Sequence, residues 1–183
     1  MTQVITTNTI IHGVDGRVAV VEICESNGAG ETITHNITDS DMGSTDAANL
    51  DPAANPVVAG ENTVEKWQRF HLTDMGGASV IDVLKVWRDG ALGGAATHVT
   101  NARETSYAGA ATYATPIVTN STVATQAMPE EEPTGANLGI AGSLAGQLID
   151  VGYSDYLVHQ IQTDAADTVG STSNMNYQYN ETA

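Results

Sequence analysis

Short apolar or alternating stretches, separated by Gly, Pro and Asn, run through most of the chain. Residues 17–24 (RVAVVEIC) are β-branched and almost wholly apolar, as in a strand that is buried on both faces. Residues 31–37 alternate and place Ile33, His35 and Ile37 on one face, and Gly-rich turn residues lie between the two segments. This pattern predicts a β-hairpin.

Five more stretches have strand character, and no stretch carries the sustained 3.6-residue apolar stripe of a helix. The last of them (NMNYQYN) alternates cleanly, with Met175, Tyr177 and Tyr179 on one face. About eight short strands separated by turns predict an all-β fold, an antiparallel β-sandwich of immunoglobulin-like or jelly-roll-like type. The five stretches are residues 67–73, 80–87, 113–118, 156–163 and 174–180, and a further short apolar segment covers 144–151.

The length of 183 residues suits one domain. Residues 1–9 carry no core signal, so we expect an extended N-terminal arm that reaches a neighbour, followed by a single β-sandwich domain over 10–183. Residues 38–62 are rich in Gly, Pro, Asn and Asp and show no period. Such a long loop is uncommon in a compact domain, so we expect this acidic loop to be functional or to lie against a neighbour.

The chain is strongly acidic, with 22 Asp and Glu against 6 Lys and Arg and a formal net charge of −16. This charge repels phosphate groups, so we expect neither nucleic acid nor a membrane as a partner. The apolar runs are far shorter than the roughly 20 residues that span a bilayer. Met1 is followed by polar residues, so no secretory signal is predicted. We interpret the acidic charge as a means of keeping a concentrated or crowded surface protein soluble through mutual repulsion. The alternative explanation is a salty habitat, where screening weakens that repulsion.

Side chains that bind metals are scattered along the chain. Cys24 is the single cysteine, which excludes an intrachain disulfide and a cysteine-rich zinc site. The histidines show neither HxH nor HxxxH spacing, so we predict no metal ligand and no cofactor, and we expect His35, His71 and His159 on half-buried strand faces. The five histidines are His12, His35, His71, His98 and His159.

Asp39, Asp41 and Asp46 in the long loop resemble the start of a calcium-binding loop. The EF-hand pattern then requires Gly at its sixth position and Glu at its twelfth, where this chain has Ser44 and Leu50. We therefore interpret the segment as a solvated acidic loop, with an irregular calcium site as the alternative.

The catalytic motifs are incomplete. Ser143 and Ser154 lack the glycine spacing of the G-x-S-x-G nucleophile elbow, and no strand-to-helix context is predicted around them. Glu130, Glu131 and Glu132 lie between two prolines, where a solvated charge run is the expected arrangement and a hydrolytic carboxylate pair the alternative. The sequence therefore predicts no catalytic and no cofactor-binding residue, and a protein that is not an enzyme.

The aromatic residues fall on or beside predicted strands. Aromatic residues in that position usually pack in the core or across strands, which is the interpretation we favour. The alternative is an exposed sugar-binding face that includes Trp67 and Tyr153.

Three blocks of sequence follow one another between residues 62 and 181. They are a strand that ends in KVW (85–87), a GYSDY block (152–156) that leads into the penultimate strand, and an aromatic last strand that closes on Glu181. In this order they resemble a group of small virion proteins of tailed bacteriophages that have an immunoglobulin-like or related β-sandwich. The resemblance implies a structural protein and supplies no catalytic residue.

From these features we expect a non-enzymatic structural protein of the virion, a capsid decoration or cement protein that stabilises the shell through many-copy contacts. Its expected partners are the major capsid protein or other virion proteins, and further copies of itself in a homo-oligomer or on the lattice. The alternative is a carbohydrate-binding or adhesion module associated with the tail or fibre.

Overall fold

The computed structural model describes residues 4–11, 18–107, 126–167 and 172–183. These residues form ten strands and no helix, in agreement with the absence of a helical apolar stripe. The described ranges therefore hold no helix long and apolar enough to cross a membrane. The strands are β1 (Val4–Ile11), β2 (Val20–Asn27), β3 (Thr32–Thr34), β4 (Lys66–Asp74), β5 (Val80–Arg88), β6 (Thr97–Glu104), β7 (Gln126–Ala127), β8 (Gly152–Tyr153), β9 (Tyr156–Gln162) and β10 (Thr172–Thr182).

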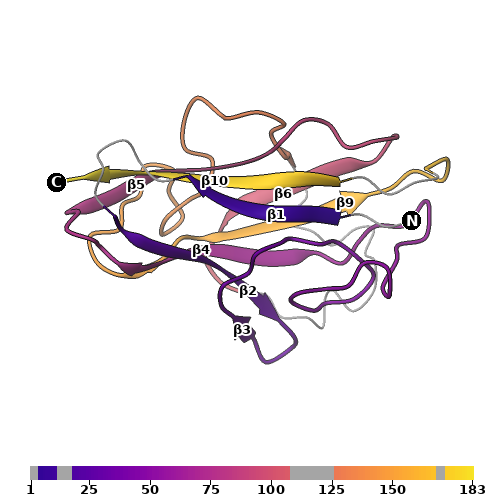
Figure 1. Cartoon of the computed structure of the whole chain (residues 1–183), viewed down its shortest axis with the longest axis horizontal. Helices are drawn as coiled ribbons and strands as arrows, with labels where there is room; N and C mark the ends of the chain where they lie inside the picture. The colour runs from indigo at the N-terminus through magenta and orange to yellow at the C-terminus, as the bar shows by residue number, and fades with distance from the viewer. Residues whose placement is uncertain (1–3, 12–17, 108–125, 168–171) are drawn as a thin grey trace.

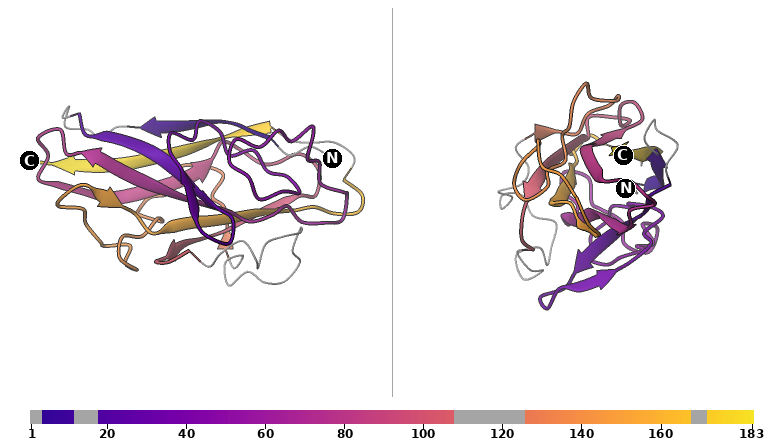
Figure 2. Two further views of the ribbon diagram at one scale, coloured as in Figure 1. Left: turned by 90° about the horizontal axis from the view of Figure 1, so that it is seen from below. Right: turned by 90° about the vertical axis from the view of Figure 1, so that its left-hand side faces the viewer.

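The strands form two sheets that pack together as an elongated β-sandwich (Figure 1, Figure 2). The smaller sheet has the order β1-β10-β5, and the larger has the order β3-β2-β4-β9-β6-β7, with β8 added to β4. Strands β1 and β10 run parallel, whereas the other named pairs are antiparallel. The prediction of an all-β sandwich is confirmed.

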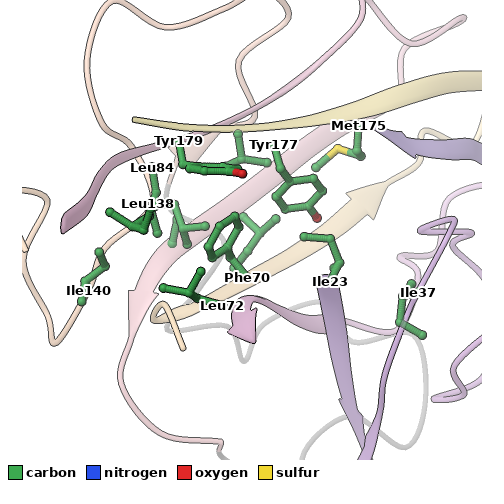
Figure 3. Close-up of a cluster of buried hydrophobic side chains, with 14 of the residues drawn as sticks. Ile23, Ile37, Phe70, Leu72, Leu84, Leu138, Ile140, Met175, Tyr177 and Tyr179 are labelled. Atoms are coloured by element: carbon green, nitrogen blue, oxygen red, sulfur yellow. The ribbon is translucent and has the colours of Figure 1, made fainter. Parts of the chain in front are cut away.

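Alternating side chains on β10 join the two sheets. Met175, Tyr177 and Tyr179 are at most 1% exposed, and Figure 3 shows them pointing away from β10 into the core. Phe70 on β4 meets Tyr179 edge-on, with ring centroids 5.2 Å apart. Because aromatic side chains each bury about 150–250 Å², this one face of β10 supplies much of the contact between the sheets.

Most of the predicted strands correspond to strands of the structure. The hairpin predicted over 17–24 and 31–37 appears as the antiparallel pair β2 and β3, although β2 is fully buried only in its second half. The stretches 67–73 and 80–87 correspond to β4 and β5, and the last two predicted strands correspond to β9 and β10. The stretch 113–118 lies outside the described residues.

The pattern of apolar and polar residues predicts neither β1 nor β6. Strand β6 lies in a Gly- and Ala-rich stretch without a clear period, and its long pairing with β9 supplies the order that the local sequence lacks. From Val4 onward, the segment expected as a free arm (1–9) instead belongs to β1, which pairs with β10 inside the same chain. Its partner is the far end of the chain, so no local pattern marks this pairing.

The long loop over 38–62 packs on its own sandwich. Met42, Leu50 and Val57 are buried, each with 6% exposure or less. The backbone at Gly43 is tightly enclosed, since a Cβ there would lie 2.6 Å from the Asn55 carbonyl oxygen. The loop thus buries these three side chains without a neighbouring molecule, whereas its Val58 is exposed.

Candidate functional site

The described aromatic residues lie mainly inside the fold. Trp67 is 2% exposed, and its ring centroid lies 5.5 Å from that of Tyr156. Tyr153 is half-buried and stacks on His71, with ring centroids 4.0 Å apart, while the Arg69 guanidinium lies 3.8 Å from its ring centroid. The packing interpretation is confirmed for these residues. Trp67 is therefore not available to a sugar-binding face.

The acidic residues of the Pro-framed loop pair with cations from β5. Glu132 Oε1 lies 2.7 Å from Lys85 Nζ, and Glu130 Oε1 lies 3.1 Å from Arg88 Nη2. Both glutamate side chains are about half exposed, at 49% and 55%. These contacts hold the loop against β5 and agree with the solvated charge run expected from the sequence.

Asp46 and Ser154, both singled out above, make structural hydrogen bonds. Asp46 accepts from the backbone amide of Gly28 at 2.9 Å and thereby supports the β2–β3 turn. Ser154 Oγ accepts from the Phe70 amide at 3.0 Å and donates to the Asp155 carbonyl at 2.7 Å. Within the described ranges, the aspartates of the long loop do not belong to any group of three or more metal-type side chains.

A buried polar network occupies part of the interior, with Gln68 at its centre. Gln68 Oε1 accepts hydrogen bonds from His159 Nε2 and Tyr177 Oη, both at 3.1 Å. Gln68 Nε2 donates to Glu25 at 2.9 Å, and Lys66 Nζ donates to the other carboxylate oxygen of Glu25 at 2.8 Å. Because Tyr177 belongs to the smaller sheet, the network links the two sheets through polar contacts.

Two neutral histidines extend this network. His98 Nε2 lies 2.8 Å from His159 Nδ1. Because His159 Nε2 donates to Gln68, its Nδ1 accepts a hydrogen bond from His98 Nε2. Burial lowers the pKa of His98 to about 3, with a smaller contribution from Arg88. Burial, together with His98 and Lys66, also holds the pKa of His159 well below its ordinary value. The expectation of a half-buried position for His159 is wrong, since this residue is fully buried.

A second group of polar side chains converges on the opposite face of the larger sheet. It consists of Glu22, Cys24, His35 and His71, and we call it the Glu–Cys–His cluster. Glu22 Oε1 lies 2.6 Å from Nδ1 of both histidines. Cys24 Sγ lies 3.5 Å from Glu22 Oε1 and 3.3 Å from His35 Nδ1. All four ligand-type atoms lie within 4.8 Å of one another, which makes this the one such group among the described residues.

Sheet register places these side chains. Glu22 and Cys24 are two residues apart on β2, so they share a face, while Ile23 between them points into the core (Figure 3). Glu22 pairs directly with His71 across β2 and β4. His35 follows the end of β3, beside Asn36, whose φ of 56° belongs to the left-handed region and turns the chain there.

The cluster alters the acidity of its members. Burial raises the pKa of Glu22, but hydrogen bonds from His35, His71 and Cys24 outweigh burial and lower this pKa overall. Burial and the neighbouring Glu22 carboxylate raise the pKa of the Cys24 thiol to about 12. The free protein therefore holds a protonated thiol beside a carboxylate that accepts several hydrogen bonds.

Linear spacing hides this cluster, since its residues come from three separate segments. The side chain of His71 is 17% exposed, which fits the half-buried position expected for it, whereas that of His35 is 47% exposed. His12 lies outside the described residues. The one local signal is the Glu22-x-Cys24 spacing on a predicted strand, and it acquires meaning only with the register of β3 and β4.

Exposed apolar side chains gather at one end of the sandwich. Val18 and Val20 are 67% and 51% exposed at the start of β2, and Ile149 and Val151 are 74% and 53% exposed just before β8. These two segments lie on either side of the same end of β4, because Val20 pairs with Asp74 while Gly152 pairs with Leu72. We call these four residues the apolar end.

No protein family, curated protein or solved structure with which the chain was compared matches it.

Proposed function

We propose that the protein is a non-enzymatic structural protein of a virion that docks on a protein shell in many copies, as a capsid decoration protein does. The observation that carries this proposal is the apolar end, where four large aliphatic side chains stand more than half exposed. Exposed apolar patches on an otherwise polar surface are typical of protein–protein contact sites.

Charge supports a protein surface as the partner of the apolar end. A chain with a net charge of −16 repels nucleic acid and anionic lipid. Docking on a protein shell through apolar side chains does not require the Lys and Arg residues that nucleic-acid binding requires. The acidic residues on the rest of the surface repel those of neighbouring copies and keep the copies apart. The sequence blocks that resemble phage virion proteins favour a capsid or another virion protein as that shell.

The adhesion module remains the second candidate, with less support. An exposed aromatic face would favour glycan binding, but Trp67 is buried and Tyr153 is covered on its ring faces by His71 and Arg69. A sugar-binding role would therefore have to use other side chains.

The test uses particles produced with and without the gene. Cryo-EM is expected to show density for the protein spread over the capsid lattice. Density confined to the tail tip would favour the adhesion module instead. Absence of any such density from the particles produced with the gene would refute both assignments.

A docking assay tests the apolar end itself. Purified protein is added to particles that lack it, and co-sedimentation is measured. Val20→Ser combined with Val151→Ser is expected to weaken docking about a hundredfold, since losing two buried valines costs about 3 kcal/mol. Val58→Ser is the matched control, because Val58 is 62% exposed and lies in the long loop instead. Equal docking by both variants would exclude the apolar end as the contact.

A further inference from the structure

The Glu–Cys–His cluster brings together the side chains that bind zinc in proteins. A thiol, two imidazoles and a carboxylate form a four-ligand set that Zn²⁺ accepts in tetrahedral geometry. The acidic loops of this chain offer oxygen atoms alone. The cluster is therefore chemically distinct from a solvated acidic surface, and its mixed ligand types point to a specific cation.

The distances within the cluster are close to those of a metal centre. With bonds of about 2.0–2.3 Å, neighbouring ligands of tetrahedral zinc lie about 3.3–3.6 Å apart. The Cys24 Sγ atom already lies 3.3 Å from His35 Nδ1 and 3.5 Å from Glu22 Oε1. The two contacts of Glu22 with histidine nitrogens, at 2.6 Å, must lengthen by about 0.7 Å to admit the ion. His35 is exposed and free to make such an adjustment.

The surroundings hold the ligands in place and leave a route for the ion. Glu22 and Cys24 are held by β2, and His71 by β4. The His71 ring stacks on Tyr153 with an interplanar angle of 10°. His35, with a side chain that is 47% exposed, lies on the open side. A cation can therefore enter past His35 and reach three ligands that β2 and β4 already hold close together.

Charge balance also favours a divalent cation. Bound Zn²⁺ would face one carboxylate and one thiolate, with both imidazoles neutral, so the complex has no net charge. A neutral complex suits the site, because Cys24 is fully buried and the Glu22 side chain is only 13% exposed. On binding, the thiol proton leaves for solvent and the sulfur takes its place in the coordination shell.

We propose that Glu22, Cys24, His35 and His71 bind one zinc-type divalent cation. The ion closes its shell with four protein ligands, as in structural zinc sites, and ties the segment after β3 to β2 and β4. Strand β3 has three residues and pairs only with β2 among the described strands, so the edge of the larger sheet gains a cross-link there. This inference is independent of the proposed virion role.

The first experiment measures zinc binding by the full chain after treatment with a chelator. Zn²⁺ is titrated by calorimetry in excess Ca²⁺ and Mg²⁺, which occupy nonspecific acidic sites. We expect one Zn²⁺ per chain and a rise in melting temperature. Absence of binding under these conditions would overturn the proposal.

Two variants separate the cluster from the acidic surface. His35→Ala removes an exposed ligand with little effect on packing and is expected to weaken zinc binding at least about a hundredfold, as loss of a direct ligand exceeds the about 10–100-fold cost of an outer-shell change. Asp39→Asn, in the long acidic loop, is the control and should bind as wild type does. Equal affinity of His35→Ala and wild type would overturn the proposal.

Cobalt substitution tests the sulfur ligand directly. Co²⁺ in the cluster is expected to give the intense visible bands of tetrahedral cobalt and a sulfur-to-cobalt charge-transfer band in the near ultraviolet. Cys24→Ser, with its fold checked by circular dichroism, should lose the charge-transfer band. A weak octahedral spectrum without that band in the wild-type protein would show that the cluster does not bind the ion, and would overturn the proposal.

Discussion

The buried pair His98 and His159 predicts that the protein loses stability in mild acid. Both rings are neutral in the folded protein, and burial lowers the pKa of His98 to about 3. In the unfolded chain each histidine takes up a proton near its ordinary pKa of about 6.5. The stabilisation from a lowered histidine pKa is therefore fully present above pH 6.5 and decreases as the pH falls toward 3.

The magnitude follows from linkage between protonation and unfolding. Below pH 6.5 each such histidine lowers the free energy of unfolding by about 1.4 kcal/mol per pH unit. Between pH 7 and pH 5, His98 alone accounts for about 2 kcal/mol. His159 acts in the same direction, because its pKa is lowered as well. Glu22, whose pKa is lowered from 4.5, contributes a loss only in more acidic solution.

Urea unfolding at pH 7, 6 and 5 measures this loss. The matched variant is His98→Gln, since the Gln Nε2 can replace the His98 Nε2 as donor to His159 without titrating. The variant is expected to show a smaller decrease in unfolding free energy between pH 7 and pH 5, by about 2 kcal/mol. If wild type and variant lose stability equally over this range, the assignment of the acid sensitivity to His98 is wrong.

Two further predictions concern packing and backbone. Trp87 is 6% exposed, so Trp87→Ala should lower the free energy of unfolding in urea by about 3–5 kcal/mol; an unchanged unfolding curve would contradict its burial. Gly76 has φ 58°, and a Cβ there would lie 2.1 Å from the Val18 carbonyl oxygen, so Gly76→Ala should lower the melting temperature. Gly90→Ala is its control, with φ 68° and no atom within 4 Å of the added Cβ, and it should melt higher than Gly76→Ala.

Local patterns were sufficient for the strands whose side chains alternate. The 174–180 stretch predicted the inward face of β10, and Met175, Tyr177 and Tyr179 are indeed buried. The Gly-rich turn after β2 predicted the hairpin with β3. In both cases the signal lies within a few residues, because side-chain direction in a strand repeats every two residues.

Contacts between distant parts of the chain left no such signal. Strand β1 is ordered by its parallel partner at the other end of the chain, from Val4 with Thr172 to Ile11 with Gln178. The segment over 38–62 shows no regular alternation of apolar and polar residues. Its buried side chains, such as Met42, occur at irregular intervals and do not belong to a strand. These features depend on surfaces that exist only after the sandwich has formed.

By itself, the sequence determined the acidic charge, the all-β class and the buried face of the last strand, since composition and a two-residue period are local properties. Only the tertiary structure decided where the isolated polar residues lie. The register of β2 with β4 places Glu22 and Cys24 beside His71, and the β2–β3 hairpin brings His35 to them. Register between strands is set by packing of the whole core, so no linear spacing could place these four side chains together.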